Sequence, residues 1–206
     1  MKVAIIGYGF VGKALKKGLQ DDVKTLLIDP KLNTEISDLR SFLPDIVFIC
    51  VPTPMNDDGS QDLKILNNIT NELKELSLTS LIVIKSTVLP NHVHSFEQLF
   101  PNFVYNPEFL RERYANEDFI NSELIILGGN QDSTKSLANF YRKHTKCIST
   151  QYQYTDLISA SLIKYSINTF LSNKVIFFNQ LHEIFKKSGV KVILILYTII
   201  IYSVIN

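Results

Sequence analysis

The chain has 206 residues, of which 46% are hydrophobic and 20% are charged, and its formal net charge is +1. This composition is that of a globular protein with a buried core, and the length allows one large domain or one domain with part of a second. The near-zero net charge does not suggest a strongly charged partner. We therefore expect no nucleic acid partner.

The chain has two cysteines, Cys50 and Cys147. They lie far apart beside β-branched apolar residues, so they are interpreted as buried free thiols rather than a disulfide or metal site. His92 and His94 lack a third ligand, and no metal is predicted. The opening residues MKVAIIGYGF become glycine-rich too early for a secretory leader. These features predict a cytoplasmic protein.

The first predicted unit is a strand, a glycine-rich turn and a helix. Residues 3–6 form an apolar strand pattern, and residues 11–19 have helical spacing of apolar side chains. Between them Gly7, Gly9 and Gly12 have G-x-G-x-x-G spacing, which permits a tight turn, close approach of a pyrophosphate, and close packing of helix on strand. The free N–H groups at the start of the helix favour phosphate. This context predicts a dinucleotide site, with FAD or S-adenosylmethionine as the alternative ligand.

The second predicted strand, residues 24–29, ends at Asp29. At this position of a dinucleotide-binding fold a carboxylate can accept hydrogen bonds from both ribose hydroxyls, and it would repel a 2′-phosphate. The sequence therefore predicts NAD rather than NADP as the cofactor.

Strand and helix patterns continue to alternate as far as residue 149. The predicted strands are 45–51, 80–86, 102–106 and 122–129, and the predicted helices are 63–76, 91–100 and 133–144. Such alternation predicts an α/β, Rossmann-like, doubly wound and mostly parallel sheet, which we assign to a domain of residues 1–150.

Three loops follow strands of this predicted sheet. They are VPTP (51–54), STVLPN (86–91) and NPEFLRE (106–112). Ligands of doubly wound sheets bind beyond the carboxyl ends of the strands, so these loops are candidates for binding groups. Alternatively, the prolines of the first loop could simply end a strand, and the Ser–Thr pair of the second could cap a helix.

Residues 154–188 are predicted to form one long helix that ends with Gly189 as its cap. Lys164 and Asn168 are four residues apart and share a helix face with mostly small or apolar residues. Lys164 is either a snorkelling lysine or, if held in a cleft, a candidate stabiliser of a negatively charged oxygen. We assign residues 151–189 to the start of a central domain.

Five segments in this order resemble the UDP-glucose/GDP-mannose dehydrogenase family. They are GYGFVG, VPTP, STV, NPEFLRE and KYSINTFLSNKVIFFNQL, and the resemblance covers roughly residues 1–189. The NPEFLRE loop followed by EDF, LGG and K-x-x-x-N is far more selective than the glycine turn. β-Hydroxyacid dehydrogenases share the glycine turn and the Lys-x-x-x-Asn helix but lack this acidic loop.

The resemblance implies NAD-dependent oxidation of the C6 hydroxyl of a nucleotide sugar, of the UDP-glucose type, to the uronate for polysaccharide precursors. In the family a thiol holds the sugar as a thiohemiacetal and then a thioester, and two NAD are consumed. The resemblance also implies a homodimer formed through the helix at 154–188. A membrane partner is not expected.

The resemblance further implies roles for particular residues. Glu108 and Glu112 would manage the hydrolytic water or the sugar, and Thr87 would position that water or the nicotinamide. Lys164 and Asn168 would hold the C6 oxygen while it bears negative charge. The predicted cofactor contacts are Gly7, Gly9, Phe10, Val11, Gly12, Asp29, Lys31, Thr53, Ser86 and Thr87. The predicted substrate contacts are Phe109, Leu110, Arg111, Lys164 and Asn168.

The chain departs from the family pattern in three ways. The connector after Asp29 is short, and Arg113 and Tyr114 replace small residues after the acidic loop. No segment matches the family's GGxCFPKD-type nucleophile, and the second nucleotide-sugar-binding domain has no counterpart. We therefore expect a truncated chain that binds NAD but does not complete the oxidation alone. The alternatives are a non-catalytic NAD-binding and dimerising remnant, or a β-hydroxyacid-type dehydrogenase using Lys164 as acid and base.

Residues 190–206 form an apolar tail rich in β-branched residues. The apolar stretch is shorter than the ~20 residues needed to cross a bilayer, and its composition is prone to strand aggregation. We interpret it as the product of truncation or a frame shift. A membrane-associated end and a genuine strand are the alternatives.

Overall fold

The structure is a computed structural model that describes residues 1–189, so the expectations for the tail at 190–206 lie outside the described residues. The chain divides into two compact units, Met1–Lys164 and a second that begins at Tyr165. No described helix is both long enough and apolar enough to span a membrane. The assignment of 151–189 to a separate central domain stays a prediction.

The first unit is built on a seven-stranded sheet in the order β2-β1-β3-β4-β5-β6-β7. The first five strands in this order are parallel, β6 is antiparallel to β5, and β7 is parallel to β6. The predicted mostly parallel sheet is thus confirmed. The strands are β1 (Lys2–Ile6), β2 (Lys24–Ile28), β3 (Ile46–Ile49), β4 (Leu81–Ile84), β5 (Phe103–Tyr105), β6 (Leu124–Gly129) and β7 (Gln151–Thr155).

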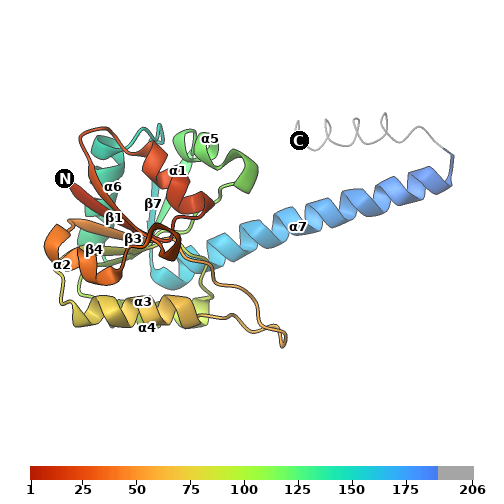
Figure 1. Cartoon of the computed structure of the whole chain (residues 1–206). Coiled ribbons are helices and arrows are strands. Elements are labelled where there is room, and N and C mark those ends of the chain that lie inside the picture. Colours follow the sequence, from red (N-terminus) through yellow and green to blue (C-terminus); the bar gives the residue numbers. More distant parts are fainter. Residues whose placement is uncertain (190–206) are drawn as a thin grey trace. The chain divides into compact units, whose positions relative to one another are not determined.

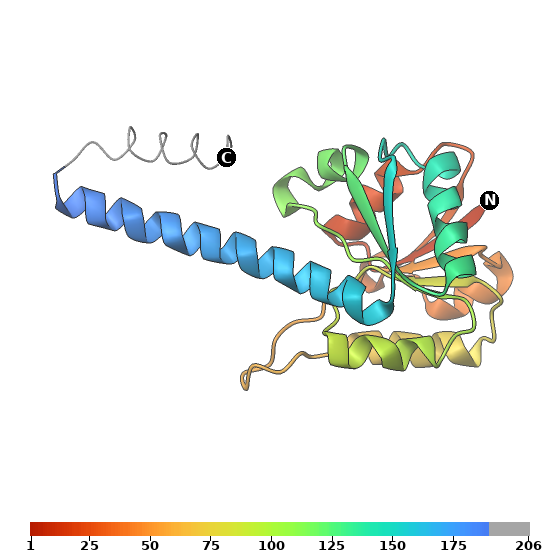
Figure 2. The same cartoon turned by 180° about the vertical axis from the view of Figure 1, so that it is seen from behind.

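Helices cover both faces of the sheet, as the doubly wound prediction requires. Figures 1 and 2 show α1, α5 and α6 on one face and α2, α3 and α4 on the other. Side chains alternate between the two cores along β1, with Val3 and Ile5 in one and Ala4 and Ile6 in the other. The helices are α1 (Phe10–Gly18), α2 (Leu39–Phe42), α3 (Lys64–Glu75), α4 (Pro90–Glu97), α5 (Ala115–Ile120), α6 (Gln131–His144) and α7 (Leu157–Lys187).

The structure corrects the start of the long helix. We predicted that it begins at residue 154, but residues up to Thr155 belong to β7, and α7 begins at Leu157. The QYQYT segment has the period of two that a strand requires, and β7 pairs with β6 along its whole length. Asp156 starts the helix, because its Oδ1 accepts a hydrogen bond from Ser159 N at 2.8 Å. Helix α5 was not predicted.

The predicted end of the long helix is confirmed. Gly189 has φ +70°, and its N–H donates to Lys186 O at 3.4 Å. Glycine is favoured at this position because a left-handed backbone carries no penalty without a Cβ.

Candidate functional site

A cleft of about 480 Å³ lies at the carboxyl ends of β1 to β5. Strands β2 and β3 flank β1 on opposite sides, so the chain changes direction across the sheet here, where ligands of such folds bind. The cleft is lined by residues that follow each of these strands. They are Gly7, Tyr8, Gly9, Phe10, Val11, Asp29, Lys31, Cys50, Val51, Pro52, Thr53, Lys85, Ser86, Thr87 and Glu108.

The glycine turn forms one wall of the cleft. Gly7 has φ +90°, and a Cβ there would lie 2.7 Å from Cys50 O, so only glycine fits. A Cβ at Gly9 would meet no atom within 4 Å, which leaves its cleft side open to a ligand. Helix α1 begins at Phe10 without a side-chain cap, so the first N–H groups of the helix remain available for phosphate oxygens.

Asp29 forms the far wall at the end of β2. Its Oδ2 accepts from Tyr8 N at 2.7 Å and its Oδ1 accepts from Lys31 N at 2.9 Å. These backbone donors hold the pKa of the Asp29 carboxyl below its usual value, because they stabilise the charged form. Each carboxylate oxygen keeps a further lone pair for a ribose hydroxyl. The open glycine turn and the ionised acid together fit NAD, and the residues predicted to hold the cofactor all line this cleft except Gly12, which packs behind it.

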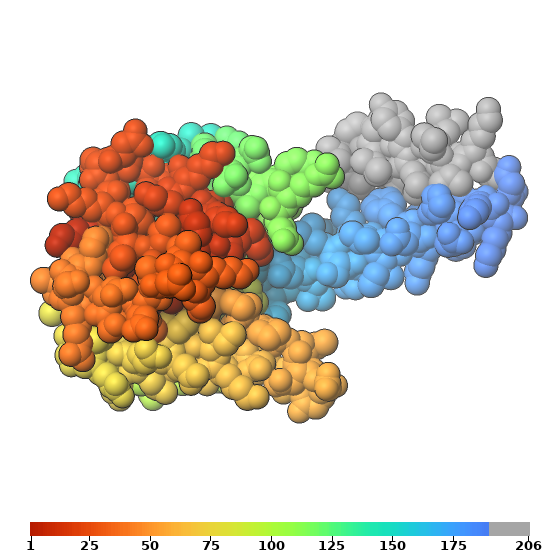
Figure 3. Space-filling view, viewed as in Figure 1, coloured from red at the N-terminus to blue at the C-terminus, as the bar shows by residue number. Residues whose placement is uncertain are grey.

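The loop after β4 is held by two side chains from the segment after β3. Thr53 Oγ1 and Gln61 Nε2 both donate to Thr87 O, at 2.7 and 2.8 Å. Gln61 Oε1 also accepts from Leu89 N at 3.0 Å. Helix α4 begins without a side-chain cap, so the alternative that Ser86 or Thr87 caps a helix is wrong. Gln61 belongs to an arm of residues 52–62, which projects from the first unit and is drawn in orange in Figure 3.

Replacing Thr53 by valine is expected to lower the free energy of unfolding by about 1 kcal/mol, because it removes one neutral hydrogen bond at constant volume. It should also weaken NAD binding, since Thr87 loses a support. Thr25, whose Oγ1 donates to Val23 O away from the cleft, is the matched control. Urea unfolding and calorimetric titration with NAD measure both effects. Equal loss of NAD affinity in Thr53→Val and Thr25→Val would contradict the assignment.

Lys164 contacts the acid loop, defined as residues 106–112, through Glu108, which lines the cleft. The ammonium of Lys164 donates to Glu108 O and lies 3.6 Å from Glu108 Oε1. The two side chains are only 6% and 12% exposed. Glu108 Oε2 accepts from Leu110 N at 2.6 Å, and the Lys164 ammonium lies 5.0 Å from the centre of the Phe109 ring. Lys164 is therefore buried against the acid loop, and the snorkelling alternative is wrong.

The start of α7 is fastened to the loop after β4. Ser161 Oγ donates to Val88 O at 2.6 Å, and both groups are buried. This bond places Lys164, one turn later, beside the loop that carries Thr87. Burial lowers the pKa of Lys164, and the neighbouring Glu108 opposes that shift.

Of the predicted catalytic and substrate-binding residues, Thr87 and Glu108 line the cleft. Phe109 and Leu110 line a small cavity beneath the acid loop instead, and Lys164 contacts Glu108 without lining the cleft itself. Arg111, Glu112 and Asn168 line neither space.

Arg111 is exposed and pairs with Asp118, with Nη2 2.7 Å from Oδ1 and Nε 3.0 Å from Oδ2. This pair fastens the acid loop to α5. Glu112 is exposed in the short 3-10 helix η3 (Glu112–Tyr114). Asn168 is exposed and lies in the second unit. Their functional roles stay predictions.

Sequence reasoning missed a buried polar group beneath the acid loop, formed by Lys85, Asn106 and Tyr141. A lysine inside the apolar run LIVIKS was the available signal. Cys50 is a free buried thiol as predicted, while Cys147 is free but only partly buried.

The fold and this cleft define an NAD-binding domain of the dehydrogenase type. Residues 13–145 match the NAD binding domain model of the UDP-glucose/GDP-mannose dehydrogenase family. The chain belongs to this family.

Individual relatives agree with this assignment. The chain is 35% identical to a UDP-glucose 6-dehydrogenase of Rickettsia typhi over 72% of this chain and 36% of that protein. Among solved structures it resembles a GDP-mannose dehydrogenase of Pseudomonas aeruginosa, with a TM-score of 0.80, 23% identity, and coverage of 97% of this chain and 56% of that one. A UDP-glucose dehydrogenase of Pyrobaculum islandicum is similar with a TM-score of 0.80, 23% identity, and coverage of 96% and 56%. The chain thus spans about a third of the curated relative and about half of the solved chains.

Proposed function

We propose that this chain supplies the NAD site and the alcohol-oxidising groups of a nucleotide-sugar dehydrogenase. The substrate would be a sugar of the UDP-glucose type, and the product of the whole reaction would be the uronate used for polysaccharide precursors. The observation that supports this most is the buried Lys164–Glu108 pair, because Glu108 lines the NAD cleft and Lys164 is fixed against it.

Oxidation of an alcohol needs an acceptor for its proton and support for the oxygen while it is negatively charged. Bound NAD supplies the hydride acceptor. The Lys164 ammonium has three protons, and its bond to Glu108 O leaves donor capacity for the C6 oxygen. Glu108 would accept the hydroxyl proton directly or through a water molecule, and Thr87 would position that water or the nicotinamide.

The step from aldehyde to acid needs a nucleophilic thiol in this family, and Cys50 is unsuited to it. Cys50 borders the cleft but is only 8% exposed, and burial raises its pKa to about 12. A thiol with such a pKa has almost no thiolate at neutral pH. Cys147 is partly buried, and burial raises its pKa as well. We therefore propose that this chain alone carries out one oxidation at most.

The proposal includes a homodimer formed through α7. The part of this helix in the second unit carries large apolar side chains that are more than half exposed, and such surface favours a protein partner. They are Phe170, Leu171, Val175, Ile176, Phe177 and Ile184. The same surface would serve the alternative function, a non-catalytic NAD-binding and dimerising protein.

Single-turnover measurements separate these functions. We expect the chain, mixed with NAD and stoichiometric UDP-glucose, UDP-N-acetylmannosamine or GDP-mannose, to form NADH with one of these sugars. Lys164→Met should slow that step by about 10²–10³, because the developing charge loses its fixed donor. Lys135→Met, at an exposed position of α6, is the matched control.

NADH formation from small 3-hydroxy acids and not from nucleotide sugars would instead indicate the β-hydroxyacid type of reaction. NAD binding without NADH from any of these alcohols would support the non-catalytic alternative. Steady production of the uronate by the chain would contradict the limit of one oxidation.

A further inference from the structure

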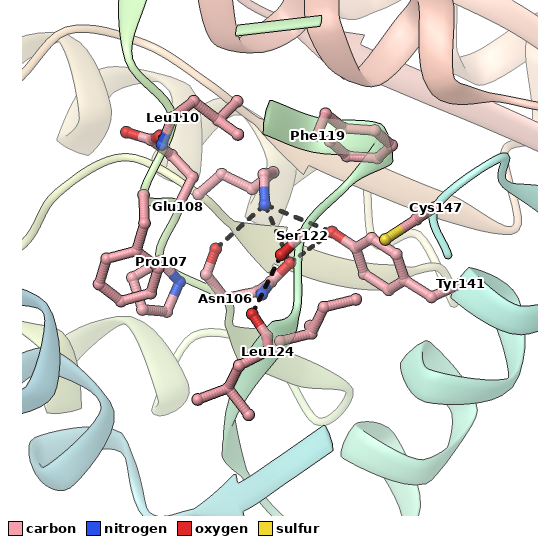
Figure 4. Close-up of a pocket in the computed structure, with 12 residues that line it drawn as sticks. Asn106, Pro107, Glu108, Leu110, Phe119, Ser122, Leu124, Tyr141 and Cys147 are labelled. Atoms are coloured by element: carbon pink, nitrogen blue, oxygen red, sulfur yellow. Dashed lines mark hydrogen bonds between the residues drawn. The ribbon is translucent and has the colours of Figure 1, made fainter. Parts of the chain in front are cut away.

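Lys85 is a buried lysine that the proposed reaction does not use. It follows β4 and is 4% exposed. Its Nζ donates to Asn106 Oδ1 at 3.0 Å, to Tyr141 OH at 3.3 Å and to Asn106 O at 3.4 Å. Asn106 is the first residue of the acid loop, and Figure 4 shows it facing Tyr141 from the opposite wall of a small cavity.

The hydrogen bonds of Lys85 are those of an ammonium group. Burial lowers the pKa of Lys85, and the nearby Glu108 opposes that shift. Three acceptor contacts match the three protons of an ammonium group. Tyr141 gives its own proton to Asn106 Oδ1 at 2.7 Å, so its oxygen accepts from Lys85. The amide of Asn106 donates in turn to Ile126 O at 2.8 Å, which fixes its orientation. Within residues 1–189 no carboxylate lies within 4.0 Å of the Lys85 ammonium, so its hydrogen-bond partners are neutral, and Glu108 acts on it only from a greater distance.

Lys85 stands between two spaces. It lines the NAD cleft on one side and the small cavity beneath the acid loop on the other. Two other charged side chains belong to the same group of residues. Glu108 also lines both the cleft and the small cavity, and Lys164 pairs with Glu108. The lining of this end of the cleft therefore contains Lys85 and Glu108, and Lys164 is held against Glu108.

The order of the residues that line the cleft indicates which part of the cofactor Lys85 would face. The glycine turn and Asp29 would take the pyrophosphate and the adenosine ribose. The nicotinamide would then lie toward the end lined by Thr87, Glu108 and Lys85. The nicotinamide ring of NAD⁺ is positively charged, whereas that of NADH is neutral. A buried cation repels the charged ring of NAD⁺ and not the neutral ring of NADH, because charges interact strongly where water is excluded.

We propose that Lys85 biases the cleft toward the reduced cofactor by placing a buried positive charge beside the nicotinamide, while its bonds to Asn106 position the acid loop. A cleft that binds NADH more tightly than NAD⁺ makes the bound cofactor a stronger hydride acceptor, which is the direction that alcohol oxidation requires. The proposal depends on NAD binding alone and not on the identity of the sugar.

The test is the ratio of the two dissociation constants, Kd for NAD⁺ over Kd for NADH. We expect Lys85→Met to lower this ratio by roughly tenfold relative to the unmodified chain, because the repulsion of NAD⁺ disappears. A purely structural role for Lys85 would weaken both cofactors alike and leave the ratio unchanged. Lys85→Arg, which keeps the charge, should retain the ratio, and Lys135→Met at an exposed site should not change it. Calorimetry for NAD⁺ and fluorescence titration for NADH measure the constants.

A measurement on the unmodified chain covers the case in which Lys85→Met does not fold. ADP-ribose lacks the nicotinamide, so we expect NADH to bind more tightly than ADP-ribose and NAD⁺ to bind no more tightly. Equal affinities for NAD⁺ and NADH in the unmodified chain would overturn the proposal, as would an unchanged ratio in folded Lys85→Met. A chain that binds none of the three would overturn the NAD assignment together with it.

Discussion

Replacing Gly12 by alanine is expected to abolish dinucleotide binding by disrupting the packing of α1 on β1. A Cβ at this position would overlap Gly7 O and lie 3.3 Å from Ile5 Cγ2. The backbone of Gly7 has no room to retreat, because it already packs against the carbonyl of Cys50. Such overpacking lowers the free energy of unfolding by about 1–3 kcal/mol or more. The displaced helix would also withdraw its first N–H groups from the cleft.

Gly9→Ala is the matched control, because the same methyl group there meets no protein atom within 4 Å. Its φ of −73° is accessible to alanine, so we expect the stability to change by less than about 0.5 kcal/mol. NAD affinity should nevertheless fall about tenfold or more, since the methyl occupies space that the pyrophosphate needs. Urea unfolding and NAD titration of both variants separate the two effects. Full NAD affinity in Gly9→Ala would show that phosphate binds elsewhere.

Replacing Asp29 by asparagine is expected to weaken NAD binding on the order of a hundredfold, because charge-assisted hydrogen bonds to both ribose hydroxyls are lost. The preference for NAD over NADP should shrink at the same time, since the carboxylate no longer repels a 2′-phosphate. Asp58→Asn is the control, because Asp58 is an exposed acid on the arm at 52–62 that bonds Ser60 and does not line the cleft. Tighter binding of NADP than of NAD by the unmodified chain would contradict the assignment.

The pKa of Asp29 sets the pH dependence of this interaction. The N–H of Tyr8, followed by that of Lys31, lowers the pKa of Asp29 below 3.8. When folding lowers the pKa of a carboxyl group, the ionised group stabilises the folded state at every pH above its pKa in the unfolded chain. This stabilisation is lost as the pH falls through the lower pKa of the folded state. We therefore expect NAD affinity to be independent of this group between about pH 5 and 8. A marked fall of NAD affinity within that range that is absent in Asp29→Asn would disprove it.

Sequence alone was sufficient for six of the seven strands, the glycine turn and the cofactor. The spacing of Gly7, Gly9 and Gly12 and the acid that ends the second strand are local features, so their geometry follows from a few consecutive residues. The continuous apolar runs of β3 and β4 predicted strands buried on both faces, and all of their residues are buried. Within the QYQYT segment, Tyr154 and Thr155 were wrongly assigned to the long helix that follows. The period of two was present in the sequence, and pairing with β6 shows that the segment is a strand.

The burial and the contacts of Lys85 and Lys164 were decided by the tertiary structure. Lys164 and Glu108 are 56 positions apart, and so are Lys85 and Tyr141, so no local pattern reports their contact. A lysine on an apolar helix face can reach water or enter a cleft with the same sequence around it. Arg111 was predicted to face the substrate, but the structure pairs it with Asp118 across the turn into α5. Burial and charge pairing depend on which distant segments the fold brings together, and that is why they escaped prediction.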